Sequence, residues 1–85
     1  MNIFEQKNVQ LVTEFDRYII QNPEFAEAIP NGALVVMEME GDDAFNEWSH
    51  RMAQQQAEMG QPVVYVRIKK LRQVQSRIEE LEIEA

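Results

Sequence analysis

Apolar residues recur every three or four positions in the stretch from about Ile3 to Ile20. One face collects Phe4, Leu11, Val12, Phe15, Tyr18 and Ile19. This period predicts an amphipathic helix. Asn22 ends it, because the residue before a proline is steered away from helical backbone angles. Pro23 then suits the first position of a second, short helix that runs to about Ala28.

Two later stretches are almost continuously apolar: ALVVMEM at 33–39 and PVVYVRI at 62–68. Turn residues precede both, Pro30-Asn31-Gly32 before the first and Gly60 before the second. Short apolar runs bounded by turn signals are typical of strands that are covered on both faces. We therefore expect two such strands.

The segment between these strands has the pattern of a helix. Its apolar stripe consists of Phe45, Trp48, Met52 and Met59. Asp42 or Asp43 can cap its start, and Gly60 can end it in the left-handed conformation. A strand, a helix and a second strand form a βαβ unit with parallel strands and a right-handed crossover. The expected fold class is α/β: N-terminal helices, then a βαβ unit with a small parallel sheet, as one domain over residues 1–70.

Residues 71–85 form a charged, amphipathic C-terminal tail. Leu71, Val74, Ile78 and Leu81 step by three, four and three positions, which favours a helix. Leu81-Glu82-Ile83-Glu84 alternates, which is the pattern of a strand. The helix is the preferred interpretation, and an extended tail is the alternative.

Two strands alone leave two open sheet edges with unpaired backbone groups. Both strands are nevertheless apolar enough to need cover. Self-association would provide it, so we expect a homodimer. A third strand supplied by the tail would be the other solution.

Charge is distributed unevenly along the 85 residues, which carry 15 acids, 8 bases and a net charge of −7. Five of the bases lie between Arg67 and Arg77, a stretch without acids, and Glu79, Glu80, Glu82 and Glu84 follow. The negative field disfavours nucleic-acid binding, and no aromatic residue interleaves the bases to stack on nucleotides. The tail's charges can pair within the chain, or they can dock a protein partner of complementary charge.

The docking interpretation gives a specific set of partner-binding residues at the end of the chain. They are Arg67, Lys69, Lys70, Leu71, Arg72, Val74, Arg77, Ile78, Leu81 and Ile83. Their apolar members would serve as anchors, with the neighbouring glutamates meeting bases on the partner.

A second hypothesis is a divalent-metal or small-ligand site after the first strand, where α/β sheets bind ligands. The candidate ligands are Glu38, Glu40, Asp42 and Asp43. Helix capping explains these acids equally well, and their spacing lacks the pattern of a calcium-binding loop. His50 is the single histidine, and we expect it at the surface beside a Glu47–Arg51 pair.

No catalytic residue and no cofactor is predicted. The absence of cysteine excludes disulfides, thiolate metal sites and cysteine nucleophiles. Ser49 and Ser76 lack the glycine context of a nucleophile elbow. No apolar run reaches the roughly 20 residues of a membrane span, and the acidic start does not have the pattern of a signal peptide. We expect a cytoplasmic protein.

The segments NPEF, IPNGA and GQPVVYVRIK, within about residues 5–70, resemble a small prokaryotic family known only as a domain of unknown function. The resemblance implies a free-standing cytoplasmic protein, with no catalytic or binding residues to transfer. In size and acidity, its members are similar to the antitoxins of toxin–antitoxin pairs. The net charge of −7 and the polarised tail lead to the expected function, a non-enzymatic protein-interaction module that is antitoxin-like or regulatory. The alternative is the small ligand- or metal-binding protein.

Overall fold

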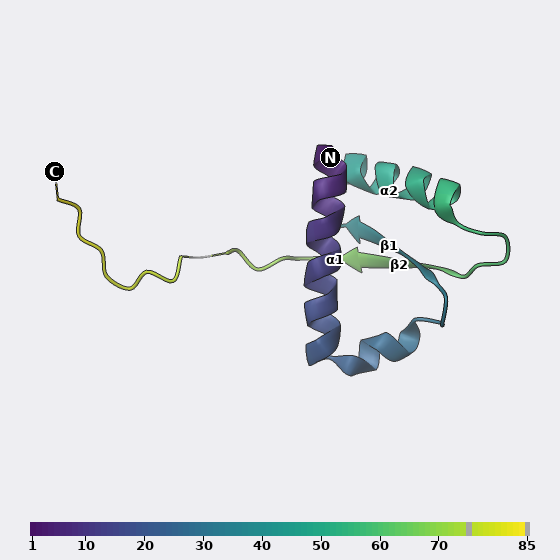
Figure 1. Ribbon diagram of the computed structural model, residues 1–85, viewed down its shortest axis with the longest axis horizontal. Helices are drawn as coiled ribbons and strands as arrows, with labels where there is room; N and C mark the ends of the chain where they lie inside the picture. The colour runs from purple at the N-terminus through teal and green to yellow at the C-terminus, as the bar shows by residue number, and fades with distance from the viewer. Residues whose placement is uncertain (75, 85) are drawn as a thin grey trace.

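The computed structural model describes residues 1–74 and 76–84 and has the expected α/β architecture (Figure 1). Two helical elements precede a strand–helix–strand unit whose strands form a parallel, two-stranded sheet. In chain order the elements are α1 (Ile3–Gln21), the 3-10 helix η1 (Pro23–Ala28), β1 (Leu34–Met39), α2 (Asp43–Gln56) and β2 (Val63–Ile68).

Local sequence signals define the N-terminal elements. The side chain of Asn2 caps α1 by accepting a hydrogen bond of 2.8 Å from the backbone N–H of Glu5. At the other end, Asn22 leaves helical geometry and Pro23 opens η1 as predicted. Figure 1 shows α1 running across the carboxyl ends of both strands, with α2 beyond the β1 edge of the sheet and η1 beyond the β2 edge.

The sheet pairs β1 and β2 residue for residue, from Leu34 opposite Val63 to Met39 opposite Ile68. Between them, α2 begins at its cap Asp42, whose side chain accepts a hydrogen bond from the N–H of Phe45. This helix ends at Gln56, earlier than the stripe through Met59 indicated, and Met59 is fully exposed. A helix of this length spans about 21 Å and a six-residue strand about 20 Å, so the chain must leave the helix there to start β2 beside β1.

The core lies where α1, β1 and α2 meet. Leu11, Met37 and Phe45 are its fully buried members, and Phe4 and Trp48 pack their rings against it. Three consecutive residues of β1 are buried, from Val36 to Glu38, so both faces of this strand are covered as expected.

The same expectation is wrong for β2, in which no residue is buried. Tyr65 and Arg67, which lie on one face of this strand, are exposed, and Tyr65 is 50% exposed. The physical reason is the placement of the helices, because α2 packs closely against β1 while η1 stays away from the sheet (Figure 1).

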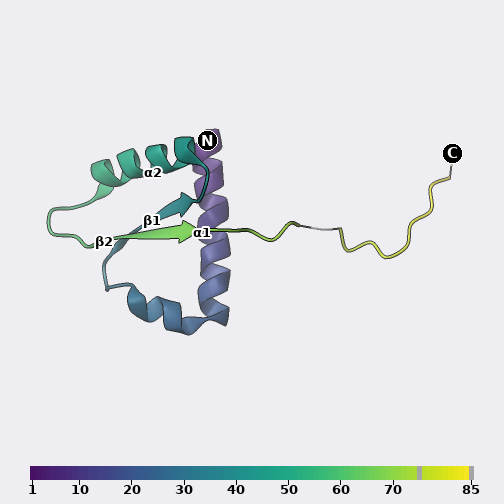
Figure 2. The same ribbon diagram turned by 180° about the vertical axis from the view of Figure 1, so that it is seen from behind.

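The tail is the clearest difference from the expected structure. Its described residues, 71–74 and 76–84, form neither helix nor strand and extend away from the body of the molecule (Figure 2). The helix favoured by the spacing of Leu71, Val74, Ile78 and Leu81 is therefore absent from them. An isolated helix shorter than about 12–15 residues is marginal in water, and no element here packs against its apolar face.

Candidate functional site

The four acids after β1 do not converge on one point. Glu38 is buried within the strand, whereas Glu40 is exposed in the following turn. Asp42 caps α2 and forms an ion pair with Lys7 of α1, and Asp43 is the exposed first residue of α2. Among residues 1–74 and 76–84, no three histidine, cysteine or acidic side chains are grouped to hold a metal ion. The structure therefore places the predicted ligands in separate structural roles.

The environment of Asp42 favours its charged form. Its carboxylate accepts a hydrogen bond from the Lys7 ammonium, and a second one from the N–H of Phe45. These contacts, the first being the larger, hold the pKa of Asp42 below its ordinary value against the opposing effect of desolvation. The Lys7 ammonium also lies 5.4 Å from the centre of the Phe45 ring, so this contact ties α1 to the start of α2.

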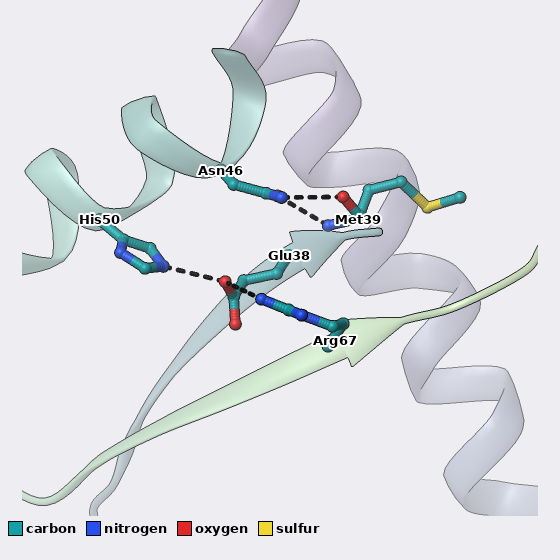
Figure 3. Close-up of polar contacts among 5 residues, drawn as sticks. All are labelled: Glu38, Met39, Asn46, His50 and Arg67. Atoms are coloured by element: carbon teal, nitrogen blue, oxygen red, sulfur yellow. Dashed lines mark hydrogen bonds and ion pairs between the residues drawn. The ribbon is translucent and has the colours of Figure 1, made fainter. Parts of the chain in front are cut away.

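Glu38 is instead the centre of a polar cluster on the face of the sheet opposite Met37, where His50 of α2 reaches its carboxylate (Figure 3). Its carboxylate Oε2 lies 3.0 Å from Nε2 of His50 and 3.5 Å from a guanidinium nitrogen of Arg67. The His50 ring, about half exposed, also contacts Tyr65 with 4.9 Å between ring centres. The cluster links β1, α2 and β2, and it compensates a carboxylate that is only 7% exposed.

Sequence reasoning placed His50 at the surface, where its side chain is about half exposed, but it paired Glu47 with Arg51 and missed this cluster. No such pair occurs in the part of the chain that the structure describes. A signal was present, because Glu38 and Arg67 are the single charged residues of their strands. In the parallel register they lie directly opposite one another. Opposite charges at the same place in two paired apolar strands indicate a cross-strand ion pair.

The outer edge of β1 is capped at its carboxyl end by a side chain. Asn46 of α2 accepts a hydrogen bond from the N–H of Met39 and donates one to its C=O, both at 2.8 Å (Figure 3). The amide thus imitates the backbone of a neighbouring strand at the carboxyl end of β1. It satisfies backbone groups that would otherwise be unpaired.

A groove of about 630 Å³ lies on the other side of the sheet, between β2, the carboxyl half of α1 and η1. We call it the β2 groove. Its walls are mainly apolar, with acidic Glu14 on one side and basic residues at the end of β2. The residues that define it include Phe15, Tyr18, Phe25, Ile29, Val64, Val66, Ile68, Arg67, Lys69, Lys70 and Leu71.

The predicted partner-binding residues fall into two groups. Arg67, Lys69, Lys70 and Leu71 line the β2 groove. The others lie farther along the tail and are exposed: Arg72, Val74, Arg77, Ile78, Leu81 and Ile83. The structure brings the first group together with an apolar hollow that sequence reasoning did not anticipate, because its walls come from segments about 50 residues apart.

The part of the chain that the structure describes contains no helix both long and apolar enough to cross a membrane. Comparison with curated proteins and with solved structures found no match. A family model described as a family of unknown function, DUF5647, matches residues 3–81 and so includes the body and most of the tail. This confirms the resemblance to a family without an assigned activity, and the chain belongs to DUF5647.

Proposed function

We propose that this protein is a non-enzymatic interaction module that binds another polypeptide through its tail. The observation that carries the proposal is the exposure of the tail's apolar residues. Val74 is 98% exposed and Ile83 86%, and Ile78 and Leu81 are more than half exposed. Apolar side chains concentrated on one extended segment are a typical binding surface when a partner buries them.

The charges of the tail add specificity to this apolar surface. A basic stretch ending at Arg77 is followed by the four glutamates of residues 79–84. Such a segment is attracted to a surface of complementary charge and is repelled by one in the wrong register. An antitoxin-like or regulatory protein that wraps a partly basic target is the concrete form of this function.

The folded body of the molecule acts as a scaffold that holds the start of the tail. The polar groups of Glu38, Asp42 and Asn46 are engaged within the fold. They contribute to holding β1, α2 and α1 together, and so give the tail a fixed point of departure at the end of β2. This division of roles is typical of a module that presents a binding segment from a stable scaffold.

Photo-crosslinking from single positions in the full chain tests the proposal. A photoreactive residue at Val74 or Ile78 should capture one polypeptide in stoichiometric yield under native conditions. The matched control is the same residue at Met59, which is fully exposed but lies outside the tail. Equal capture from Met59 and the tail positions, or no capture from either tail position, would contradict a tail-docked function.

A further inference from the structure

The outer side of β2 is an open strand edge. The carbonyls of Pro62 and Ile68 accept hydrogen bonds from residues of the β1 segment. Because backbone groups along a strand point alternately to its two sides, those of Val63, Tyr65 and Arg67 point away from β1. Among residues 1–74 and 76–84, β2 pairs with no strand except β1. An edge of this kind is a template for one more strand.

The side chains beside this edge alternate in character. Val66 and Ile68 pack toward the core on the face that bears Met37. Tyr65 and Arg67 lie on the opposite face, where they contact His50 and Glu38. A strand that pairs with β2 would therefore have its apolar residues beside Val66 and its acidic residues beside the basic side chains at 67 and 69.

The end of the tail has this complementary pattern. Leu81 and Ile83 alternate with Glu82 and Glu84. Placed along β2, the two apolar residues would enter the β2 groove, and the two glutamates would face a rim that carries Arg67, Lys69 and Lys70. Three cations and one acid, Glu14, line this groove, so its charge also favours an acidic strand.

The tail of the same chain is poorly suited to fill its own groove. To pair residues 81–84 with its own β2, the chain would have to fold back over residues 69–80. These residues contain no glycine, proline, asparagine or aspartate, and Ser76 is their single residue of a type that favours turns. In the structure the chain continues beyond β2 in the direction of the strand (Figure 2).

We propose that residues 81–84 of one copy add to the β2 edge of a second copy as a third strand, and that the exchange is reciprocal. This inference rests on the proposed function and names the tail's partner as the chain itself. In a two-fold pair whose β2 strands run in opposite directions, each tail runs antiparallel to the partner's β2. The 13 residues from Ile68 to Leu81 can span up to about 45 Å. That reach exceeds the two shorter dimensions of the molecule, 31 and 22 Å.

A pair of charge-reversed variants tests the exchange by sedimentation equilibrium. The tail variant is Glu82→Lys/Glu84→Lys, and the groove variant is Lys69→Glu/Lys70→Glu. In either variant alone, like charges meet at both interfaces, so the dimer should dissociate at least about tenfold more readily than the unmodified chain. In an equimolar mixture each tail meets a groove of opposite charge, and a heterodimer of near-original affinity should form.

One control variant and one further test variant complete this experiment. Glu47→Lys/Glu58→Lys makes the same change in net charge as the tail variant, at exposed positions outside the groove and tail, and it should dimerise like the unmodified chain. Leu81→Ser/Ile83→Ser removes the apolar anchors and should weaken the dimer about 100-fold. Circular dichroism of each variant verifies that the body is folded.

Three results would overturn the exchange: a monomeric full chain at all concentrations, a dimer unaffected by either charge-reversed variant, or a mixture that fails to form the heterodimer. The photo-crosslinks separate the inference from the function on which it rests. Capture of a different polypeptide from Val74 by a monomeric chain would refute the exchange and retain the tail-docked module. A chain without any tail crosslink would refute both.

Discussion

The two strands of the sheet are equal in length and similar in sequence, yet their environments differ. β1 has three consecutive buried residues, and Asn46 closes its outer edge at Met39. β2 has no buried residue, and its outer edge faces the β2 groove. The β1 side of the sheet is thus covered by α2 of the same chain, whereas the β2 side leaves an apolar groove of the kind that a partner would fill. An apolar sequence alone therefore does not decide which strand of a small domain becomes buried.

The largest expected effect on stability comes from replacing one aromatic residue that packs against β1 and comparing it with one that lies beside β2. Phe45 is 0% exposed, so Phe45→Ala should cost about 3–5 kcal/mol in the free energy of unfolding. Phe25, which lines the β2 groove and packs edge-on against Tyr18, is half exposed. Phe25→Ala should cost about 1 kcal/mol.

Urea unfolding of both variants, at a concentration where the chain is monomeric, measures the two costs. Phe45→Leu serves as a milder second variant if the alanine protein does not fold. Equal costs at positions 45 and 25 would contradict the view that the core lies on the β1 side.

The next largest effect concerns the buried carboxylate. Glu38→Ala should destabilise the protein by about 1–3 kcal/mol, because it breaks the contacts that join β1 to His50 and Arg67. This loss of unfolding free energy is smaller than that for breaking a fully buried ion pair, because His50 and Arg67 are themselves about half exposed. Glu47→Ala, on the exposed side of α2, is the matched control and should change the unfolding free energy by less than about 0.5 kcal/mol.

Asn46→Ala tests the closure of the β1 edge directly. It removes two hydrogen bonds to Met39, so we expect a loss of about 1–2 kcal/mol. Amide hydrogen exchange at Met39 should accelerate more than exchange elsewhere in β1, since this N–H loses its acceptor. Unchanged exchange at Met39 would show that the side chain does not protect the edge. Gln54→Ala, on the exposed face of α2, controls for the loss of an amide.

The smallest effect is a pH dependence at the contact between α1 and α2. The pKa of Asp42 is lowered from 3.8 by Lys7 and by the N–H of Phe45. A lowered pKa in the folded state contributes stability that is present above the unfolded value. That stability is lost as the pH falls through the folded one. Between pH 7 and about 4 this contribution should therefore be constant, and it should decline below about pH 4.

Lys7→Met removes the main cause of this shift. The difference in unfolding free energy between the unmodified chain and this variant should narrow as the pH falls below about 4. Urea titrations at a series of pH values provide the measurement. A difference that stays constant down to pH 2.5 would mean that the Lys7–Asp42 contact does not stabilise the fold through charge.

Local patterns were sufficient to predict most of the fold. The cap at Asn2 was missed, but the break at Asn22-Pro23, the start of η1 and both strands follow from their own neighbours in the sequence. The end of α2 was misplaced at Gly60, because helix length here depends on the strand that the chain must reach. Of the candidate site, the basic residues at 67–70 were identified, whereas the apolar walls contributed by α1 and η1 were not.

The sequence by itself determined the order of the elements, the parallel βαβ unit and the charge polarity of the tail, since each depends on residues close together in the chain. Only the tertiary structure decided that Glu38 meets His50 and Arg67, that Asn46 closes the β1 edge, and that the β2 edge stays open beside an apolar groove. These features depend on which face of each helix packs against the sheet. That choice is decided by many weak contacts between segments that are distant in the sequence. The tail shows the same principle, because its helical spacing has no stabilising effect without a surface to pack against.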